Sequence, residues 1–281
     1  MRSHGREKLG GDRVAESNAI DVDHSFRVTV ITVTWEAEET IDATMGSILS
    51  QTCEGVEIVV VDGASPDSTL TRLKAFEDRI HAIVSEPDQG IYDAMNKGVA
   101  LARGEFILFM NAGDRFHDAD SLSALVDAAT ADDDIIYGDH VVTYPDGSCR
   151  EVAGGVETAL WKGMICSHQA MIARRALLLA HPFKLDRLGA DFDFIYTCYA
   201  HGARFLPIRA IVAEVSAGGV SDRRRLRSIV SRWRTIRENA PSIRRDVYYL
   251  GLMIDSLLRG VAKAVLPDRL VRRFQANAGG Q

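Results

Sequence analysis

Four apolar, β-branched stretches alternate with stretches of helical periodicity between residues 27 and 129, and this alternation constrains the fold more than any other feature. The first strand is predicted at residues 27–34 (RVTVITVT), whose composition is typical of a strand buried on both faces. Ile41, Met45 and Ile48 then recur at helical spacing. Further strands are predicted at 57–63, 81–86 and 105–111, with helices at 66–79, 91–103 and 121–129. Such units in series predict an α/β fold with a mainly parallel sheet flanked by helices.

The regular alternation ends after Asp134. Residues 135–152 are interpreted as two strands joined by a turn at residues 145–147, and a further strand is predicted at 169–173. From Asp222 onward the sequence becomes helical and basic, with an apolar stripe that includes Leu252 and Leu257. We therefore expect a helical, basic C-terminal extension after the α/β part.

Charge is divided unevenly along the chain. The residues from Asp222 onward carry 14 Lys and Arg against 5 Asp and Glu, whereas the first 221 residues carry 19 against 34. A basic segment on an acidic body favours contact with nucleic acid or with anionic lipid, although a solvated helix face explains the charge equally well. Trp233, Tyr248 and Tyr249 are too few and too apolar in context for base stacking, so no nucleic-acid partner is predicted.

Several features predict a cytoplasmic location. Residues 1–25 are polar and contain no apolar stretch typical of a signal peptide, so we expect a disordered leader there. The longest uncharged apolar run near the C-terminus, residues 247–254, is too short to span a bilayer. The four cysteines form no CxxC pair, as expected of reduced thiols in a cytosolic protein.

Polar residues end each of the four predicted strands, and the carboxyl ends of parallel strands form the edge where ligands bind. These ends are residues 34–36, 62–63, 86–90 and 111–114, and each contains a carboxylate. Carboxylates suit ribose hydroxyls, a pyrimidine NH or a divalent cation that bridges a diphosphate. The first strand end has neither GxGxxG nor GxxxxGK[ST], which disfavours dinucleotide-binding and P-loop proteins. The sequence therefore predicts a site for a nucleotide and a metal.

Five motifs occur in the order VDGASPDST, SEPDQGIYDAMNKG, FMNAGDRF, CSHQAMIARR and GADFDF. Together they closely resemble the inverting family 2 glycosyltransferases of the GT-A fold, especially the colanic-acid-type and phenolic-glycolipid-type sugar transferases. The resemblance implies a GT-A domain at residues 26–220, with a donor-nucleotide half at 26–115 and an acceptor half at 116–220. Residues 221–281 would form a membrane-associating tail. The implied substrates are a nucleotide diphosphate sugar, with UDP favoured, and a lipid-linked saccharide or glycolipid acceptor.

The resemblance assigns a group of strand-end and helix residues to the donor. They are Thr34, Trp35, Glu36, Asp62, Asp88, Asn96, Lys97, Asn111 and Gly113. Asp62 also fits a turn-forming aspartate before a glycine, and Asp88 also fits a cap of the helix that begins at Ile91. Lys97, four residues after Asp93, also fits an exposed ion pair.

The implied metal site lies at residues 111–114. Asn111 and Gly113 depart from the commoner Asp-rich form of this motif, which leaves Asp114 as its one carboxylate. Mn²⁺ or Mg²⁺ can be held by one or two protein oxygens when phosphate and water complete the shell. A site that works without a metal ion is the alternative.

An inverting transfer needs one base that takes the proton of the acceptor hydroxyl. The resemblance implies Asp191 of GADFDF, with Asp193 as the nearest alternative. On a helix over residues 190–201 these two side chains point in different directions. His168 and Gln169 would contact a diphosphate, the metal or an acceptor phosphate, although a structural histidine fits almost as well. Ser221, in a loop after two glycines, is implied as a further contact of this kind.

Two other classes remain as alternatives to the enzyme. A sugar nucleotidyltransferase would need a Gly-rich, basic loop after the first strand, where TWEAEET stands instead. A non-catalytic nucleotide-sugar-binding member of the family is suggested by the reduced metal motif, but Asp114 and Asp191 argue against it. For the enzyme, the apolar stripe and arginines of the tail predict peripheral association with the inner face of the cytoplasmic membrane.

Overall fold

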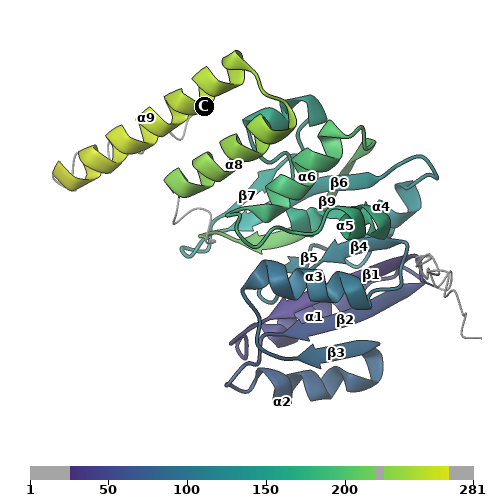
Figure 1. Cartoon of the computed structure of the whole chain (residues 1–281). Helices are drawn as coiled ribbons and strands as arrows, with labels where there is room; N and C mark the ends of the chain where they lie inside the picture. Colours follow the sequence, from purple (N-terminus) through teal and green to yellow (C-terminus); the bar gives the residue numbers. More distant parts are fainter. Residues whose placement is uncertain (1–25, 219–224, 266–281) are drawn as a thin grey trace, which may run out of the picture.

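The computed structural model describes residues 26–218 and 225–265 (Figure 1). The strands are β1 (Val28–Thr34), β2 (Val56–Asp62), β3 (Ala82–Ser85), β4 (Phe106–Phe109), β5 (Arg115–Phe116), β6 (Ile135–Thr143), β7 (Cys149–Val152), β8 (Met171–Arg174) and β9 (Phe205–Ser216). The helices are α1 (Ile41–Leu49), α2 (Thr69–Leu73), α3 (Ile91–Leu101), α4 (Ser121–Ala128), α5 (Arg175–Ala180), α6 (Ala190–Ala200), α8 (Arg225–Asn239) and α9 (Ile243–Val265). Short 3-10 turns occur at η1 (Lys74–Arg79), η2 (Glu157–Lys162) and η3 (His168–Ala170).

One sheet runs through the molecule in the order β3-β2-β1-β4-β8-β6-β9-β5, with β7 beside β6. Its first four strands are parallel, as the strand-helix alternation predicts. Every residue of β1 is buried because helices cover both faces. Val30 lies in one apolar cluster with Met45 of α1, and Ile31 lies in the opposite cluster with Met95 of α3. The predicted α/β fold is therefore confirmed, and β1 is an inner strand of its parallel part, between β2 and β4.

The helix predicted at residues 66–79 differs in form from the prediction. It begins at Thr69 and continues as the 3-10 turn η1 from Lys74. Asp67 accepts hydrogen bonds from the backbone amides of Glu38 (3.2 Å) and Thr69 (3.0 Å), and the Glu38 carboxylate accepts one from the amide of Ser68 (3.0 Å). Because these bonds hold residues 67 and 68 in a loop, the helix begins later than Pro66 suggests.

The second half of the sheet mixes directions, unlike the first. The strand β8 is antiparallel to both of its neighbours, β4 and β6, whereas β6 and β9 run parallel. The predicted hairpin is present, because β6 and β7 pair with each other. In the turn between them, the Tyr144 amide donates to the backbone oxygen of Ser148, and the Gly147 amide donates to the backbone oxygen of Tyr144. A sheet with hairpin connections is not restricted to the parallel order that helical crossovers impose.

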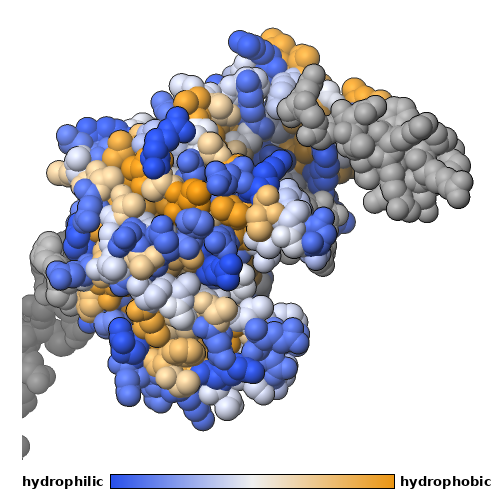
Figure 2. Space-filling model, turned by 180° about the vertical axis from the view of Figure 1, so that it is seen from behind, coloured by the Kyte–Doolittle hydropathy of each residue, from blue (hydrophilic) through white to orange (hydrophobic). Residues whose placement is uncertain are grey.

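The helices α8 and α9 pack on the second half of the molecule (Figure 1). Ile229 and Ile236 of α8 and Tyr249 of α9 are buried in the same apolar cluster as Phe194 of α6. The Tyr249 hydroxyl donates to the backbone oxygen of Trp161 at 3.1 Å. The segment predicted as a basic tail is thus helical where it is described, and part of it belongs to the core. On the face opposite that of Figure 1, apolar side chains form a band between more polar surfaces (Figure 2).

Candidate active site at the carboxyl ends of the parallel strands

The strand ends that the sequence singles out meet at one edge of the sheet. The amides of Gly63 and Ala112 donate to the backbone oxygens of Thr34 (2.9 Å) and Val33 (3.1 Å), which places the ends of β2 and β4 on either side of β1. At this edge Glu36 and Ala64 have positive φ angles of 49° and 60°. Left-handed backbone at residues other than glycine costs free energy and tends to gather at ligand sites.

Asp62 ends β2 and is fully buried. Its carboxylate accepts hydrogen bonds from the amide (2.9 Å) and hydroxyl (2.5 Å) of Ser65, and from the hydroxyl of Ser85 (2.6 Å). Ser65 in turn accepts a bond from the amide of Glu36 at 3.0 Å. Asp62 therefore has the turn-forming role that was the alternative to donor binding, and it ties three strand ends together. A direct contact of Asp62 with the donor stays a prediction.

Trp35, Gly63 and Asp88 converge beside this turn. A Cβ atom on Gly63 would lie 2.6 Å from Asp88 Oδ2 and 3.3 Å from Trp35 Cδ1, so glycine is needed for the approach. Trp35 is 62% exposed although it lies next to a buried strand. Asp88 accepts a bond from the amide of Gly90 (2.7 Å) with its other oxygen, which leaves Oδ2 near the tryptophan. An exposed indole beside a carboxylate is suited to stacking on a base and binding ribose hydroxyls.

Asn96 and Lys97 are engaged in contacts within the protein. The Asn96 amide exchanges two hydrogen bonds with the backbone of Phe183, at 2.8 and 2.9 Å. The Lys97 ammonium lies 2.8 Å from Glu86 Oε1 and 3.5 Å from Asp93 Oδ2. Lys97 therefore forms the surface pair that was the alternative to a donor contact, and Asn96 positions the loop that carries Phe183.

The loop at residues 111–114 is held in a defined shape. Gly113 has a φ of 98° and donates from its amide to the Thr44 hydroxyl at 3.0 Å. Asp114 accepts bonds from the Gln169 amide group (2.5 Å) and from the amide of Ser216 (3.4 Å). Burial raises the pKa of Asp114, and these bonds offset the effect only in part. The loop thus presents a carboxylate whose negative charge is poorly compensated.

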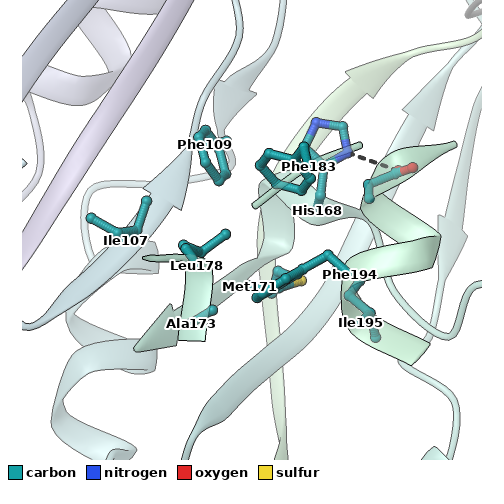
Figure 3. Close-up of a pocket in the computed structure, with 10 residues that line it drawn as sticks. Ile107, Phe109, His168, Met171, Ala173, Leu178, Phe183, Phe194 and Ile195 are labelled. Carbon is teal, nitrogen blue, oxygen red and sulfur yellow. Dashed lines mark ion pairs between the residues drawn. The ribbon is translucent and has the colours of Figure 1, made fainter. Parts of the chain in front are cut away.

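Asp191 lies at the start of α6 and is contacted from two other elements. The Tyr92 hydroxyl donates to Asp191 Oδ1 at 3.0 Å. His168 Nδ1 lies 3.4 Å from Asp191 Oδ2, and Figure 3 marks this contact with a dashed line. The other ring nitrogen of His168 is 3.0 Å from Asn111 Nδ2, which suits a ring that donates from Nδ1 and accepts at Nε2. Burial alone would raise the pKa of Asp191, but the contacts with His168 and Tyr92 outweigh it and lower that pKa below its usual value. The carboxylate is therefore ionised at neutral pH.

Asp193 points to a different side of α6. Its buried carboxylate lies 2.9 Å from Lys184 Nζ and accepts a hydrogen bond from the Thr235 hydroxyl at 2.5 Å. These contacts join α6 to α8. Of the two carboxylates in the motif, Asp191 thus faces the strand ends through His168, and Asp193 is part of a structural contact.

Comparisons with known proteins agree with this geometry. A family model described as Glycosyl transferase family 2 matches residues 29–176. The chain belongs to glycosyl transferase family 2. It is 36% identical over 208 residues to a PGL/p-HBAD biosynthesis glycosyltransferase of Mycobacterium tuberculosis, an alignment that covers 69% of this chain and 78% of the relative. The predicted family and enzyme class are confirmed.

Solved structures agree on the fold of this glycosyltransferase. It is similar to a mannosyltransferase of Pyrobaculum calidifontis in complex with GDP-Man and Mn²⁺, with a TM-score of 0.64 and 19% identity over 93% of this chain and 82% of that chain. It is also similar to TarS of S. aureus in complex with UDP-GlcNAc, with a TM-score of 0.58 and 17% identity over 83% of this chain and 72% of that chain. The fold is the GT-A fold of the sequence prediction.

A metal would meet few protein ligands in this glycosyltransferase. Within residues 26–218 and 225–265, no group of three or more His, Cys, Asp or Glu side chains is arranged to hold a metal ion. Asn111 Oδ1, however, is a buried oxygen without a hydrogen-bond partner, and the Asp114 carboxylate lies in the same loop. These two oxygens fit a hard cation that takes the rest of its shell from a diphosphate and water.

Sequence reasoning missed two residues of the glycosyltransferase site. Tyr92 lies within the motif SEPDQGIYDAMNKG, but nothing in the sequence links it to Asp191, which is 99 residues away. Phe183 packs against the Tyr92 ring, with centroids 5.6 Å apart. It also lines the apolar pocket that His168 and Asp191 border, in which Figure 3 shows Phe183 beside His168. Ser221, which the sequence assigned to a diphosphate or acceptor contact, lies outside the described residues.

Proposed function

We propose that this glycosyltransferase moves a sugar, with inversion, from a nucleotide diphosphate sugar to a lipid-linked saccharide or glycolipid acceptor in cell-surface glycolipid or polysaccharide biosynthesis. The observation that carries the proposal is the single carboxylate Asp191, kept ionised by His168 and Tyr92. The other carboxylate of the motif, Asp193, is occupied by Lys184 and Thr235. Asp191 is therefore the one carboxylate of the motif proposed as a base, and a single-displacement transfer needs one base.

In the proposed reaction, Asp191 removes the proton of the acceptor hydroxyl as that oxygen attacks the anomeric carbon. The bond from the anomeric carbon to the diphosphate oxygen breaks on the opposite face, and the nucleoside diphosphate leaves with the electron pair. His168 donates to Asp191 and so holds the carboxylate in place while it accepts the proton. Removal of that proton by a positioned base contributes roughly 10²–10⁴-fold to the rate of such reactions.

The donor would lie along the strand ends. Trp35 offers an exposed ring for the base, and Asp88 Oδ2 lies close enough to the ring to reach the attached ribose. Thr34 Oγ1, a buried hydroxyl without a partner, is available to the nucleoside. A divalent cation, Mn²⁺ or Mg²⁺, bound through Asn111 and Asp114 would neutralise charge on the leaving diphosphate. UDP is proposed as the nucleotide, with GDP as the competitor because one structural neighbour is a complex with GDP-Man.

Association with a membrane surface is proposed for α9. Five of its side chains, all at least 47% exposed, recur at spacings of four and three residues along one face, and they are Ile243, Val247, Leu250, Ile254 and Leu257. Such a stripe covers one side of a helix, and the opposite side, which includes Tyr249, packs on the protein. An amphipathic helix of this kind lies in the interface of a bilayer. Among the described residues, no helix is both long and apolar enough to cross a bilayer.

The proposed reaction is tested with the full chain, Mn²⁺ and a panel of UDP-, GDP- and dTDP-linked sugars, offered with a detergent-dispersed bacterial lipid extract. NMR of the purified glycolipid product reports the configuration of the new bond. We expect transfer from one nucleotide class, with the anomeric configuration opposite to that of the donor. Retained configuration would contradict the single-base mechanism, and no transfer from any donor would contradict the proposed function.

A further inference from the structure

Besides the apolar pocket, a second pocket, which is polar, lies away from the strand ends, between η2 and the start of α9. None of the residues assigned to the donor, the metal or the base lines it. It is formed by Val156, Thr158, Ala159, Trp161, Lys162, Ser242, Arg244 and Arg245. No carboxylate is among these lining residues. The reaction proposed above makes no use of this pocket.

Three cations line the pocket, and neutral groups position them. Lys162 Nζ lies 5.4 Å from the centroid of the Trp161 ring, and Arg244 Cζ lies 6.0 Å from the same ring. The Arg245 guanidinium donates to the Tyr196 hydroxyl (2.9 Å) and to a backbone oxygen (3.0 Å). In the part of the chain that the structure describes, none of the three is within ion-pair distance of a carboxylate. The pocket therefore presents positive charge that the protein does not neutralise.

The carboxylates nearest along the chain are directed elsewhere or do not line the pocket. Asp246 accepts a hydrogen bond from Trp233 Nε1 at 2.6 Å and lies 3.6 Å from Arg237, on the α8 side of α9. Glu157 begins η2 but is not among the lining residues. An anion in the pocket would consequently meet three cations and no opposing carboxylate, which is the arrangement that binds phosphate groups.

Exposed apolar side chains lie at the edge of the pocket and next to its lining residues along α9. Val156 is 59% exposed at its edge, and Ile243 and Val247, which begin the exposed stripe of α9, are 83% and 63% exposed. Polar and apolar atoms are interspersed at the top of the molecule in Figure 2, where the turn between α8 and α9 lies. The stripe continues to Leu257, so it extends along α9 for about 20 Å at the rise of an α-helix. A stripe along one side of an amphipathic helix suits a helix that lies in the interface of a bilayer.

We propose that the pocket of Lys162, Arg244 and Arg245 binds the phosphate of an anionic phospholipid headgroup, while the adjoining stripe of α9 lies in the bilayer interface. The proposal rests on the membrane association proposed above and names its polar anchor. Trp161, whose ring is approached by the Lys162 and Arg244 cations, would lie at headgroup depth, where tryptophan is favoured.

The test is flotation of the full chain with vesicles of phosphatidylcholine, with and without phosphatidylglycerol. The variant is the double substitution Lys162→Ala and Arg244→Ala, which leaves the structural bonds of Arg245 intact. The matched control, Lys74→Ala with Arg79→Ala, removes two exposed cations from η1. We expect the pocket variant to bind phosphatidylglycerol vesicles roughly 30-fold more weakly than the wild type, because each cation near an anionic surface contributes several-fold. The control should change little, and circular dichroism checks that both variants fold.

Equal losses in the two double variants would overturn the proposal, since net charge alone would then explain binding. Undiminished binding of the pocket variant would also overturn it. Vesicles of phosphatidylcholine doped with an isoprenyl diphosphate form a third arm. Pocket-dependent binding to these alone would overturn the headgroup assignment in favour of an acceptor phosphate. A wild-type chain that floats but binds no nucleotide would contradict the proposed function and leave the pocket proposal standing.

Discussion

The two ends of the parallel strands differ in how their buried polar groups are paired. At the amino end, Glu57 is almost fully buried and accepts hydrogen bonds from the Thr29 hydroxyl (2.6 Å), the Arg103 amide (2.7 Å) and the Arg103 side chain (2.7 Å). The Thr29 hydroxyl also accepts a bond from the amide of Gly104 at 2.9 Å. This network is closed, and it fastens β1, β2 and the start of β4 to one another.

At the carboxyl end, Asp62 is also buried and hydrogen-bonded, to Ser65 and Ser85, but other buried polar groups are left without partners. Thr34 Oγ1 and Asn111 Oδ1 are buried without partners, and Glu36 and Ala64 have left-handed backbone. Unpaired buried polar atoms and backbone strain both cost free energy, so they persist where a ligand or a function compensates for them. The comparison teaches that the amino end stabilises the sheet and the carboxyl end is arranged for a ligand.

Among the variants that test this difference between the two ends of the strands, Asp191→Asn is expected to have the largest effect, on the rate of sugar transfer. The amide cannot take the acceptor proton, so turnover should fall by roughly 10²–10⁴-fold while nucleotide binding is kept. Asp193→Asn is the matched control on the same helix. It should lower the melting temperature, because Lys184 and Thr235 lose a buried partner, and leave the chemical step nearly unchanged. Comparable losses of turnover in the two variants would contradict the assignment of the base.

Glycine substitutions at the two ends test the contrast through stability. In Gly104→Ala the new Cβ would lie 2.6 Å from the Thr29 amide nitrogen and 2.7 Å from the Val28 carbonyl carbon, and backbone cannot move aside cheaply. We expect a loss of about 3 kcal/mol in the free energy of unfolding. In Gly63→Ala the closest atom is Oδ2 of the Asp88 side chain, which can rotate away. That variant should lose little stability but bind nucleotide several-fold more weakly, as denaturant melts and titrations of both proteins would show.

Glu57→Gln tests the amino end through pH. Burial alone would raise the pKa of Glu57, but its hydrogen bonds from Thr29 and Arg103 outweigh this and lower it. A carboxyl with a lowered pKa in the folded state stabilises the protein above its unfolded pKa and loses that contribution as pH falls through the folded pKa. The wild type should therefore exceed the variant by about 2 kcal/mol at neutral pH, and the difference should shrink below about pH 4.5. A difference independent of pH, or an equal loss in Glu54→Gln at an exposed position, would contradict this role.

Much of the first half of the fold was predictable because its signals are local. Each strand of the parallel part and the helix that follows it are adjacent in sequence, and their hydrophobic periods identify them. The pairing of β6 with β9 was not predictable in this way, since it joins Ile135 to Phe205 across several intervening elements. The late start of α2 was missed for a similar reason, because its cause is a hydrogen bond from Ser68 to distant Glu38.

The candidate site was predictable in part. Motif resemblance identified Asp191 and His168, and the structure brings them within 3.4 Å of each other. It could not show that Asn96 binds the backbone of Phe183 or that Asp193 belongs to a contact with α8, because such partners depend on tertiary packing. Strand-end position therefore indicates which residues lie near the site, and the contacts decide which side chains are free for a ligand.

The smallest effect is expected for Tyr92→Phe. Removal of the hydroxyl that donates to Asp191 takes one hydrogen bond from the ionised carboxylate, so the pKa of Asp191 should rise. The acid limb of the pH-rate profile should move to higher pH, with only a several-fold fall in turnover at neutral pH. A fall in rate without a shift of that limb would indicate that Tyr92 acts on packing with Phe183 instead.

The most direct test of an open, ligand-binding carboxyl end is calorimetric titration of the wild type with UDP, GDP and dTDP, each with Mn²⁺ and with a chelator. Asp114→Ala and the exposed control Asp132→Ala, whose partner Arg204 is also at the surface, are titrated in parallel. We predict metal-dependent binding of one nucleotide that is lost in Asp114→Ala and kept in Asp132→Ala. Absence of binding under every condition, or binding unaffected by Asp114→Ala, would contradict the proposed nucleotide and metal site.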